Sequence, residues 1–192
     1  MRIFSALYAR VMRWSRHPHA NWYLAGLSFA ESSFFPIPPD VMLAPMSLAR
    51  PSRAWYLALL TTLASVVGGV LGYLIGMLAF DAIEPILHQW GYHDRYLLAR
   101  EWFADWGFWA VLLAGFSPIP YKVFTITAGV VGMVFLPFVL ASVVGRGARF
   151  FLVAALMAWG GEAMEKRLHK WVDLLGWLTV VLVIIIVAII KL

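Results

Sequence analysis

Five ionisable residues lie inside the long apolar regions of this 192-residue chain, and they are the residues best suited to chemistry. They are Glu31, Asp40, Lys122, Arg146 and Arg149. A charge at the centre of a bilayer costs at least ~2.5–3.5 kcal/mol on insertion scales, so we expect each to have a function or a partner. Arg146 and Arg149 lie three residues apart, hence on one helix face, where two guanidinium groups offer bidentate binding to phosphate. A carboxylate in an apolar cavity holds a proton more readily, so Glu31, with Asp40, is a candidate for proton coupling.

The same charges admit a structural interpretation. They neutralise one another as buried pairs that fix the fold, or Asp40 lies at the membrane edge while an arginine extends its charged end to the interface. Both interpretations stay open at this point.

The composition indicates an integral membrane protein. The chain is 62% hydrophobic and 13% charged, with a mean hydropathy of +0.82, and a chain of this size cannot hide so much apolar surface in one core. The net charge of +5 suits anionic lipid head groups. Nucleic acid is not an expected partner, because Lys and Arg are scattered in short loops rather than gathered in a stripe.

The sequence carries few other signs of chemistry. It has no cysteine, no histidine within the membrane segments and no phosphate-binding loop. We therefore expect a protein that is not an enzyme, with no catalytic residue, no metal site and no cofactor, although an acid pair such as Glu31 and Asp40 leaves catalysis open.

Two similar proline-rich stretches interrupt the apolar regions. Residues 34–40 read FFPIPPD, and residues 116–122 read FSPIPYK. Proline lacks a backbone donor, and non-helical backbone survives at membrane depth only where protein buries it or water reaches it. We therefore predict two re-entrant helical hairpins that line an interior cavity; the alternative is a proline kink in a continuous helix. The predicted hairpin tips are Pro36, Pro38, Pro39, Pro118 and Pro120.

A short repeat follows the proline stretches. The sequence ASVVG occurs at 64–68 and again at 141–145, in the same order after each broken segment. Each half then contributes one hairpin and one span, so each half crosses the membrane an odd number of times. An odd number of crossings turns the second half upside down. This favours an inverted repeat whose hairpin tips meet near the bilayer midplane. Asp40 and Lys122 occupy equivalent positions in this repeat, so we expect them to pair directly or across a polar head group.

The predicted fold is an all-α polytopic membrane protein. It begins with an interfacial amphipathic helix (1–19) and ends with a polar helix and a final span (161–192). Between them lies a membrane domain (20–160). This domain consists of two repeat halves, at about 20–80 and 106–160, joined by a connector (81–105). About three spanning helices are expected, at 54–80, 137–160 and 171–190. A stripe for close helix packing is predicted at Gly68, Gly72 and Gly76.

The basic residues predict the orientation. Arginines cluster in residues 2–16 and at Arg50 and Arg53, and further basic residues lie in 166–170. Basic loops stay in the cytoplasm, so we expect a cytoplasmic N-terminus. A single extra crossing would reverse the side of the C-terminus, which stays open.

These motifs resemble the bacterial DedA family, whose members share the VTT, or SNARE-associated-like, domain. Glu31 followed by PIPPD at 36–40 is similar to the family signature E-x4-P-x-P-x-[E/D]. Residues 68–76 are similar to the family's G-x3-G-Y-x-I-G segment. A later family block is matched by Phe116-Ser117-Pro118, Gly129 and residues 135–138.

The resemblance covers about residues 22–160 and has departures. Gly69 stands where the family usually has aspartate, and Gly115 and Tyr121 stand where it usually has arginine. In these respects the chain resembles the YqaA-like branch, and Lys122, Arg146 and Arg149 are substitutes for the family's arginines rather than matches.

The resemblance implies lipid translocation. We expect a bacterial inner-membrane transporter that flips undecaprenyl phosphate or a phospholipid between leaflets, with Lys122, Arg146 and Arg149 on the lipid phosphate and Glu31 and Asp40 exchanging protons. Homo-oligomers are possible. Two alternatives stay open: a proton or cation antiporter that moves no lipid, and a scaffold whose charges only stabilise the fold.

Overall fold

The computed structural model describes residues 17, 19–33, 37–89, 93–117 and 119–160. Every regular element in these residues is helical, which confirms the all-α prediction for this part of the chain. The helices are α2 (Ala20–Ser33), α3 (Asp40–Ala49), the 3-10 helix η1 (Pro51–Arg53), α4 (Ala54–Gln89), α5 (His93–Phe116), α6 (Tyr121–Val130) and a last helix at Phe135–Gly160. Apart from His17 and His19, the expected N-terminal helix lies outside the described residues, as do the segments expected in 161–192.

Among the described residues, two helical stretches are long and apolar enough to cross a membrane. They are Pro51–Phe80, with 30 residues, and Phe135–Gly160, with 26 residues; an 18-residue window in each has a mean hydropathy of 2.0 and 1.7, respectively. About 20 helical residues cross a bilayer core. These stretches correspond to the expected spans at 54–80 and 137–160; the third, at 171–190, lies outside the described residues.

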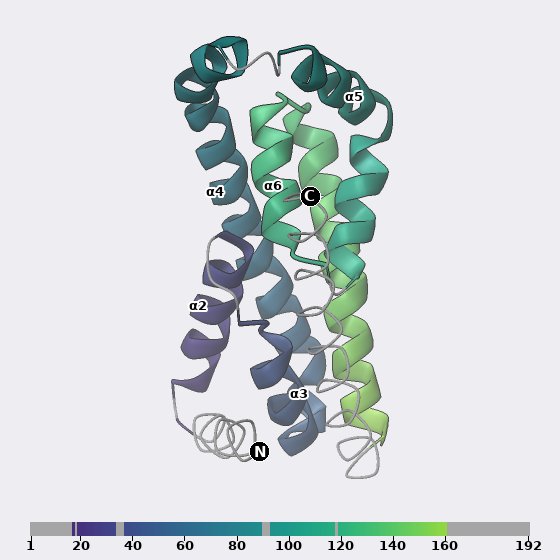
Figure 1. Ribbon diagram of the computed structural model, residues 1–192. Helices are drawn as coiled ribbons and strands as arrows, with labels where there is room; N and C mark the ends of the chain where they lie inside the picture. Colours follow the sequence, from purple (N-terminus) through teal and green to yellow (C-terminus); the bar gives the residue numbers. More distant parts are fainter. Residues whose placement is uncertain (1–16, 18, 34–36, 90–92, 118, 161–192) are drawn as a thin grey trace, which may run out of the picture.

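The proline clusters separate helices rather than bend them. α2 ends at Ser33 and α3 begins at Asp40; α5 ends at Phe116 and α6 begins at Tyr121. The alternative of one kinked, continuous helix is therefore wrong at both stretches. Figure 1 shows α2 and α3 in the lower half of the bundle and α6 beside the descending end of α5 in the upper half, so the two helical pairs lie in opposite halves of the bundle.

The apolar core of the described residues consists of two clusters, one for each helical pair. The lower cluster joins α2, α3, the start of α4 and the end of the last helix, and includes Leu24, Met46, Leu57 and Phe150. The upper cluster joins α4, α5, α6 and the start of the last helix, and includes Tyr73, Val111, Tyr121 and Phe138. Both spanning helices run through both clusters, so their middle residues lie where the clusters meet.

The glycine stripe of α4 allows its neighbours to approach at backbone distance. A Cβ on Gly68 would overlap the Phe29 carbonyl of α2, and one on Gly76 would overlap the Ile126 carbonyl of α6. Between them, a Cβ on Gly72 would lie 2.5 Å from Thr125 Oγ1. Close backbone approach through small residues is how helices associate in lipid, where no hydrophobic force drives them together.

The two ASVVG glycines make corresponding contacts. Gly68 lies against the Phe29 carbonyl of α2, and Gly145, in the last helix, lies against the Leu112 carbonyl of α5. Each spanning helix thus contacts the first helix of the pair that precedes it through the last residue of the same five-residue sequence. This correspondence is what an internal repeat predicts.

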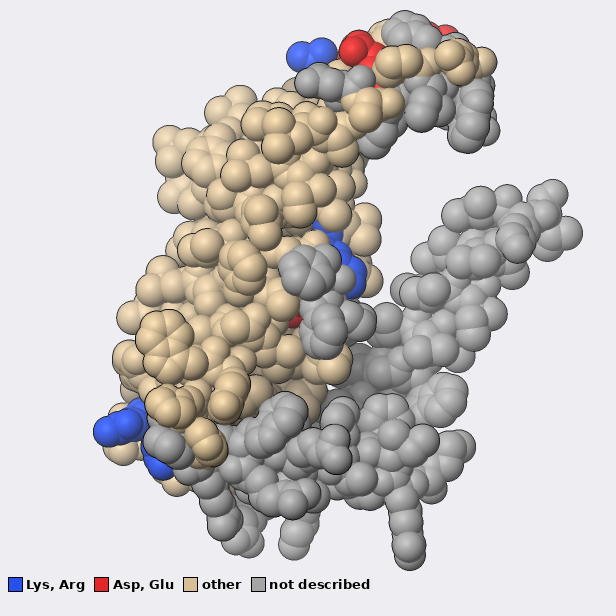
Figure 2. Space-filling model, turned by 90° about the vertical axis from the view of Figure 1, so that its left-hand side faces the viewer, with Lys and Arg blue, Asp and Glu red and all other residues tan. Residues whose placement is uncertain are grey.

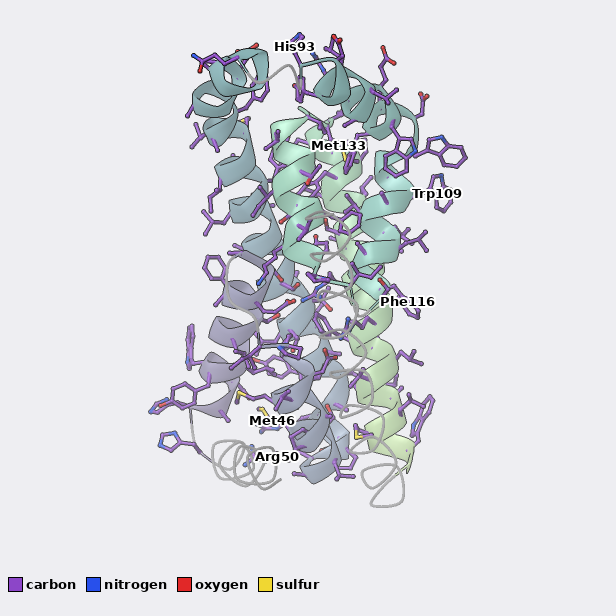
Figure 3. The ribbon with its side chains drawn as sticks, viewed as in Figure 1. Met46, Arg50, His93, Trp109, Phe116 and Met133 are labelled. Atoms are coloured by element: carbon purple, nitrogen blue, oxygen red, sulfur yellow. The ribbon has the colours of Figure 1, made fainter. Side chains whose placement is uncertain are left out.

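Large apolar side chains cover the outside of the bundle. On α4, Leu63, Val67 and Leu78 are exposed while Thr61 and Ser65 are buried, an arrangement typical of helices packed in lipid. Tryptophans gather near both ends: Trp55 lies beside Trp159 at the lower end, and Figure 3 shows Trp109 pointing away from the bundle toward the upper end. Such aromatic girdles mark membrane–water interfaces.

The close contact at Gly76 gives a test of the packing. We expect Gly76→Ala to destabilise the protein by ~1–3 kcal/mol, because the added methyl meets backbone that cannot rotate away. Gly26→Ala is the matched control, since nothing lies within 4 Å of a Cβ there and alanine favours a helix. Thermal unfolding in detergent measures both, and equal melting temperatures for the two variants would contradict the packing.

Candidate functional site

Arg146 and Glu31 form an ion pair at the junction of the two apolar clusters, which we call the enclosed pair. Arg146 Nη2 donates to Glu31 Oε2, and Arg146 Nε donates to Ser65 Oγ at 2.5 Å. Arg146 Nη2 also lies 3.3 Å from Ser32 Oγ. The arginine side chain is only 2% exposed and that of Glu31 14%. A guanidinium this deep is stabilised only if a carboxylate and further acceptors surround it.

Two aromatic rings complete the surroundings of Arg146. Its guanidinium carbon lies 4.9 Å from the centre of the Tyr121 ring and 4.6 Å from that of Phe150. Rings at this distance attract a cation through their negative faces. The Tyr121 hydroxyl donates to Ser142 Oγ at 2.5 Å, and Ser142 donates to the Phe138 carbonyl at 2.7 Å, so the tyrosine is itself held in place.

Serines fix the helix that carries Glu31. Ser28 donates to the Thr61 carbonyl at 2.8 Å, and Ser33 donates to the Gly68 carbonyl at 2.9 Å. Between them the Ser32 and Ser65 hydroxyls are 2.7 Å apart. Because Ser28 and Ser32 are four residues apart, they lie on one face of α2, and the C-terminal half of α2 is therefore hydrogen-bonded to α4. The position of Glu31 follows from this contact.

Arg149 connects the ends of both helical pairs, and we call this group the tip bridge. Its Nη1 donates to the Ser117 carbonyl, one residue beyond the end of α5, at 2.7 Å. Its Nη2 donates to Oδ2 of Asp40, the first residue of α3, also at 2.7 Å. The Arg149 side chain is 20% exposed and that of Asp40 18%. Within the described residues, buried Asp40 Oδ1 and Ser117 Oγ have no hydrogen-bond partner.

The structure brings four of the five predicted site residues into two pairs. We expected Asp40 to pair with Lys122, whereas the ion pair of Asp40 is with Arg149. Lys122 is half-buried at the start of α6, at the other helical tip. Arg146 was expected to hold a phosphate, but its enclosure leaves no free face for one in this arrangement. The two ion pairs have the geometry that the structural interpretation predicts, in which acids and arginines neutralise one another.

Sequence reasoning missed the polar residues that support these pairs. Ser32, Ser65 and Ser117 contact an arginine directly, and Tyr121 lies under Arg146. Two signals were available: Ser65 belongs to the repeated ASVVG sequence, and Ser32 follows Glu31 directly. Neither assigns a partner, because the partner depends on how the helices are rotated.

The charged pairs of the site lie midway along the bundle. In Figure 2, Lys and Arg atoms come to the surface near the two ends and at one place at mid-height, where a small acidic area lies close by. Arg146 and Arg149 are near the middle of the Phe135–Gly160 helix, and Ser65 is near the middle of Pro51–Phe80. Among the described residues, no group of three or more His, Asp or Glu side chains could hold a metal ion.

Comparisons with known proteins find similar sequences. A family model described as the VTT domain matches residues 37–159. An uncharacterized protein of Haemophilus influenzae is 51% identical over 191 residues, and another from Histophilus somni is 46% identical over 191 residues; each match covers 100% of both chains. No solved structure matches the chain.

The enclosed pair predicts a large effect on stability. We expect Arg146→Gln to destabilise the protein by ~3–5 kcal/mol, because it leaves Glu31 buried without its cation. Adding Glu31→Gln should restore part of the loss, since no charge then remains unpaired. Arg149→Gln is the control and should cost less, because its pair is more exposed to solvent. Unfolding temperatures in detergent test the order, and a double variant less stable than Arg146→Gln would contradict it.

Proposed function

Because the chain belongs to the VTT-domain, or DedA, family of membrane proteins linked to transport, we propose that it moves a phosphate-bearing lipid between the leaflets of the bacterial inner membrane. One observation carries the proposal: two carboxylate–arginine pairs lie where two helical pairs from opposite ends of the bundle meet, inside an apolar exterior. A scaffold could be stabilised with apolar residues there, whereas a polar head group needs charged partners on its way across.

The re-entrant interpretation follows from the lengths of the helices. α3 and α6 have ten residues each, about half of what a bilayer crossing needs. We propose that α2–α3 and α5–α6 enter the membrane from opposite faces and end near its midplane. Each would give a head group a polar route through one leaflet while the acyl or prenyl tails stay in lipid, as in other transporters built from inverted repeats.

The phosphate-binding role is best supported for Lys122 and Arg149. Both are partly exposed, whereas Arg146 is enclosed. An arginine binds a phosphate through two parallel hydrogen bonds, and a lysine adds a compact charge. We assign proton exchange to Asp40 and Glu31, the two carboxylates of the site. Asp40 loses its cation when Arg149 turns to another anion, whereas Glu31 keeps its pair with Arg146.

The setting of the protein follows from the same proposal. A cytoplasmic N-terminus agrees with the exposed basic residue Arg50, which lies at the lower end of the bundle (Figure 3), and with exposed Arg53 three residues further along the chain, because basic loops stay in the cytoplasm. The partners are membrane lipids and protons, and the chain acts as a transporter rather than an enzyme. The lipid is either undecaprenyl phosphate or a phospholipid, because both present a phosphate ester to the same cations.

A vesicle assay tests the proposed function. Fluorescent polyprenyl phosphate is placed in both leaflets of vesicles that contain the protein, and a membrane-impermeant reductant bleaches the label it can reach. We expect bleaching of nearly all the label with the wild-type protein and about half with empty vesicles. Asp40→Asn should slow the bleaching of label that starts in the inner leaflet by about tenfold or more. This corresponds to ~1.4 kcal/mol or more on the free-energy barrier to transport.

The control and the alternatives give distinct outcomes. Asp105→Asn changes an exposed acid of α5 away from the pairs and should leave the rate unchanged. Proton movement without lipid movement would identify an antiporter and overturn the proposal. If neither lipid nor protons move, and Asp40→Asn and Glu31→Gln only unfold the protein, the chain is a scaffold.

A further inference from the structure

We propose that the two arginines of the site have different roles, and that the lipid phosphate displaces Asp40 from Arg149 and thereby separates the two helical tips. Arg146 stays with Glu31 throughout and positions the helices. This inference rests on the proposed function, because it names the residue of that site which exchanges partners.

The surroundings of Arg146 leave no room for an exchange. Its donors contact Glu31, Ser32 and Ser65, and the rings of Tyr121 and Phe150 lie against its guanidinium group. These contacts come from four elements: α2, α4, α6 and the last helix itself. A phosphate could reach Arg146 only if several of these helices moved apart, which would expose both apolar clusters at once. Arg146 is therefore a positioning residue.

Arg149 has the opposite character. Its two hydrogen bonds go to different helical pairs, one to the Ser117 carbonyl and one to Asp40. Its side chain therefore connects Asp40, at the start of α3, to Ser117, just beyond the end of α5. If an anion takes the place of Asp40, the tip of α2–α3 loses its bond to Arg149. Ser117 meanwhile keeps its hydrogen bond to Arg149.

The tip bridge also has unused hydrogen-bonding capacity. Asp40 binds Arg149 through one oxygen only, and its other oxygen has no partner within the described residues. A phosphate can accept two parallel bonds from the same guanidinium and so competes well with a carboxylate held by one. The Ser117 hydroxyl, likewise without a partner there, lies on the residue whose carbonyl Arg149 binds and can donate to a further phosphate oxygen. The bridge therefore offers a phosphate more donors than it offers Asp40.

The absence of cysteine allows a direct measurement of the tips. Spin labels are attached to Pro38→Cys, before α3, and Val123→Cys, in α6, both at exposed positions. Pulsed electron paramagnetic resonance then gives the distance between the labels in lipid nanodiscs. The probe is farnesyl phosphate, and farnesol, which has the same tail without the phosphate, is the matched control.

We expect one narrow distance without the probe, a longer and broader distribution with farnesyl phosphate, and no change with farnesol. Arg149→Gln should give the long distribution without any probe and no further response. Arg149→Lys should raise the half-saturating concentration of farnesyl phosphate about tenfold, because a lysine cannot form the bidentate contact, whereas Arg146→Lys should leave it within about twofold.

Three results would overturn the inference: an unchanged distance with farnesyl phosphate, a narrow distance in Arg149→Gln, or an equal shift in the two lysine variants. If Arg146→Lys does not fold, a second measurement takes its place: the dipolar contact between the phosphorus of farnesyl phosphate and the guanidinium nitrogens of the ¹⁵N-arginine-labelled wild-type protein. This contact must then disappear in Arg149→Gln. Tips that separate while vesicles show no lipid movement would overturn the proposed function and leave the exchange standing; lipid movement with fixed tips would overturn the exchange alone.

Discussion

A charged group in a dry interior needs a counter-charge, and this requirement determines where the helices of the bundle meet. Arg146 lies near the middle of a spanning helix and is 2% exposed, so a carboxylate has to reach it from another element. α2 brings Glu31 to that depth because its serines bond to α4 and Gly68 lets the two backbones touch. The same contact places the end of α2, beyond which α3 begins with Asp40 of the tip bridge.

Much of the architecture could be predicted from the sequence because it depends on local rules. Clustered prolines end helices, as at 36–39 and 118–120, and glycines at every fourth residue make a flat face. The rule has limits: α3 continues through Pro45 and α4 through Pro85, since a single missing donor can be tolerated within a helix that neighbours support. Of the segment 81–105, which the sequence indicated only as a connector, residues 81–89 form the end of α4 and residues 93–105 the beginning of α5.

The pairing of the charges could not be predicted in the same way. The repeat aligns Asp40 with Lys122, yet the ion pair forms with Arg149, because a side chain's partner depends on helix rotation and on which neighbouring helix is closest. Arg146 and Arg149 share a helix face, as their spacing requires, but contact acids from different helices. The polar supports, such as Ser65 and Tyr121, lie between elements far apart in the sequence, and no local pattern identifies them.

The matching contacts of Gly68 and Gly145 have a consequence for how such a small membrane protein can serve two compartments. Under the proposed function, a component that responds to one side of the bilayer is present a second time in inverted orientation, and Arg149 connects the two copies. Opening toward either compartment would then need no separate design, because the same movement, made in turn by each copy, suffices. This symmetry would let fewer than two hundred amino acids present an entrance to each side.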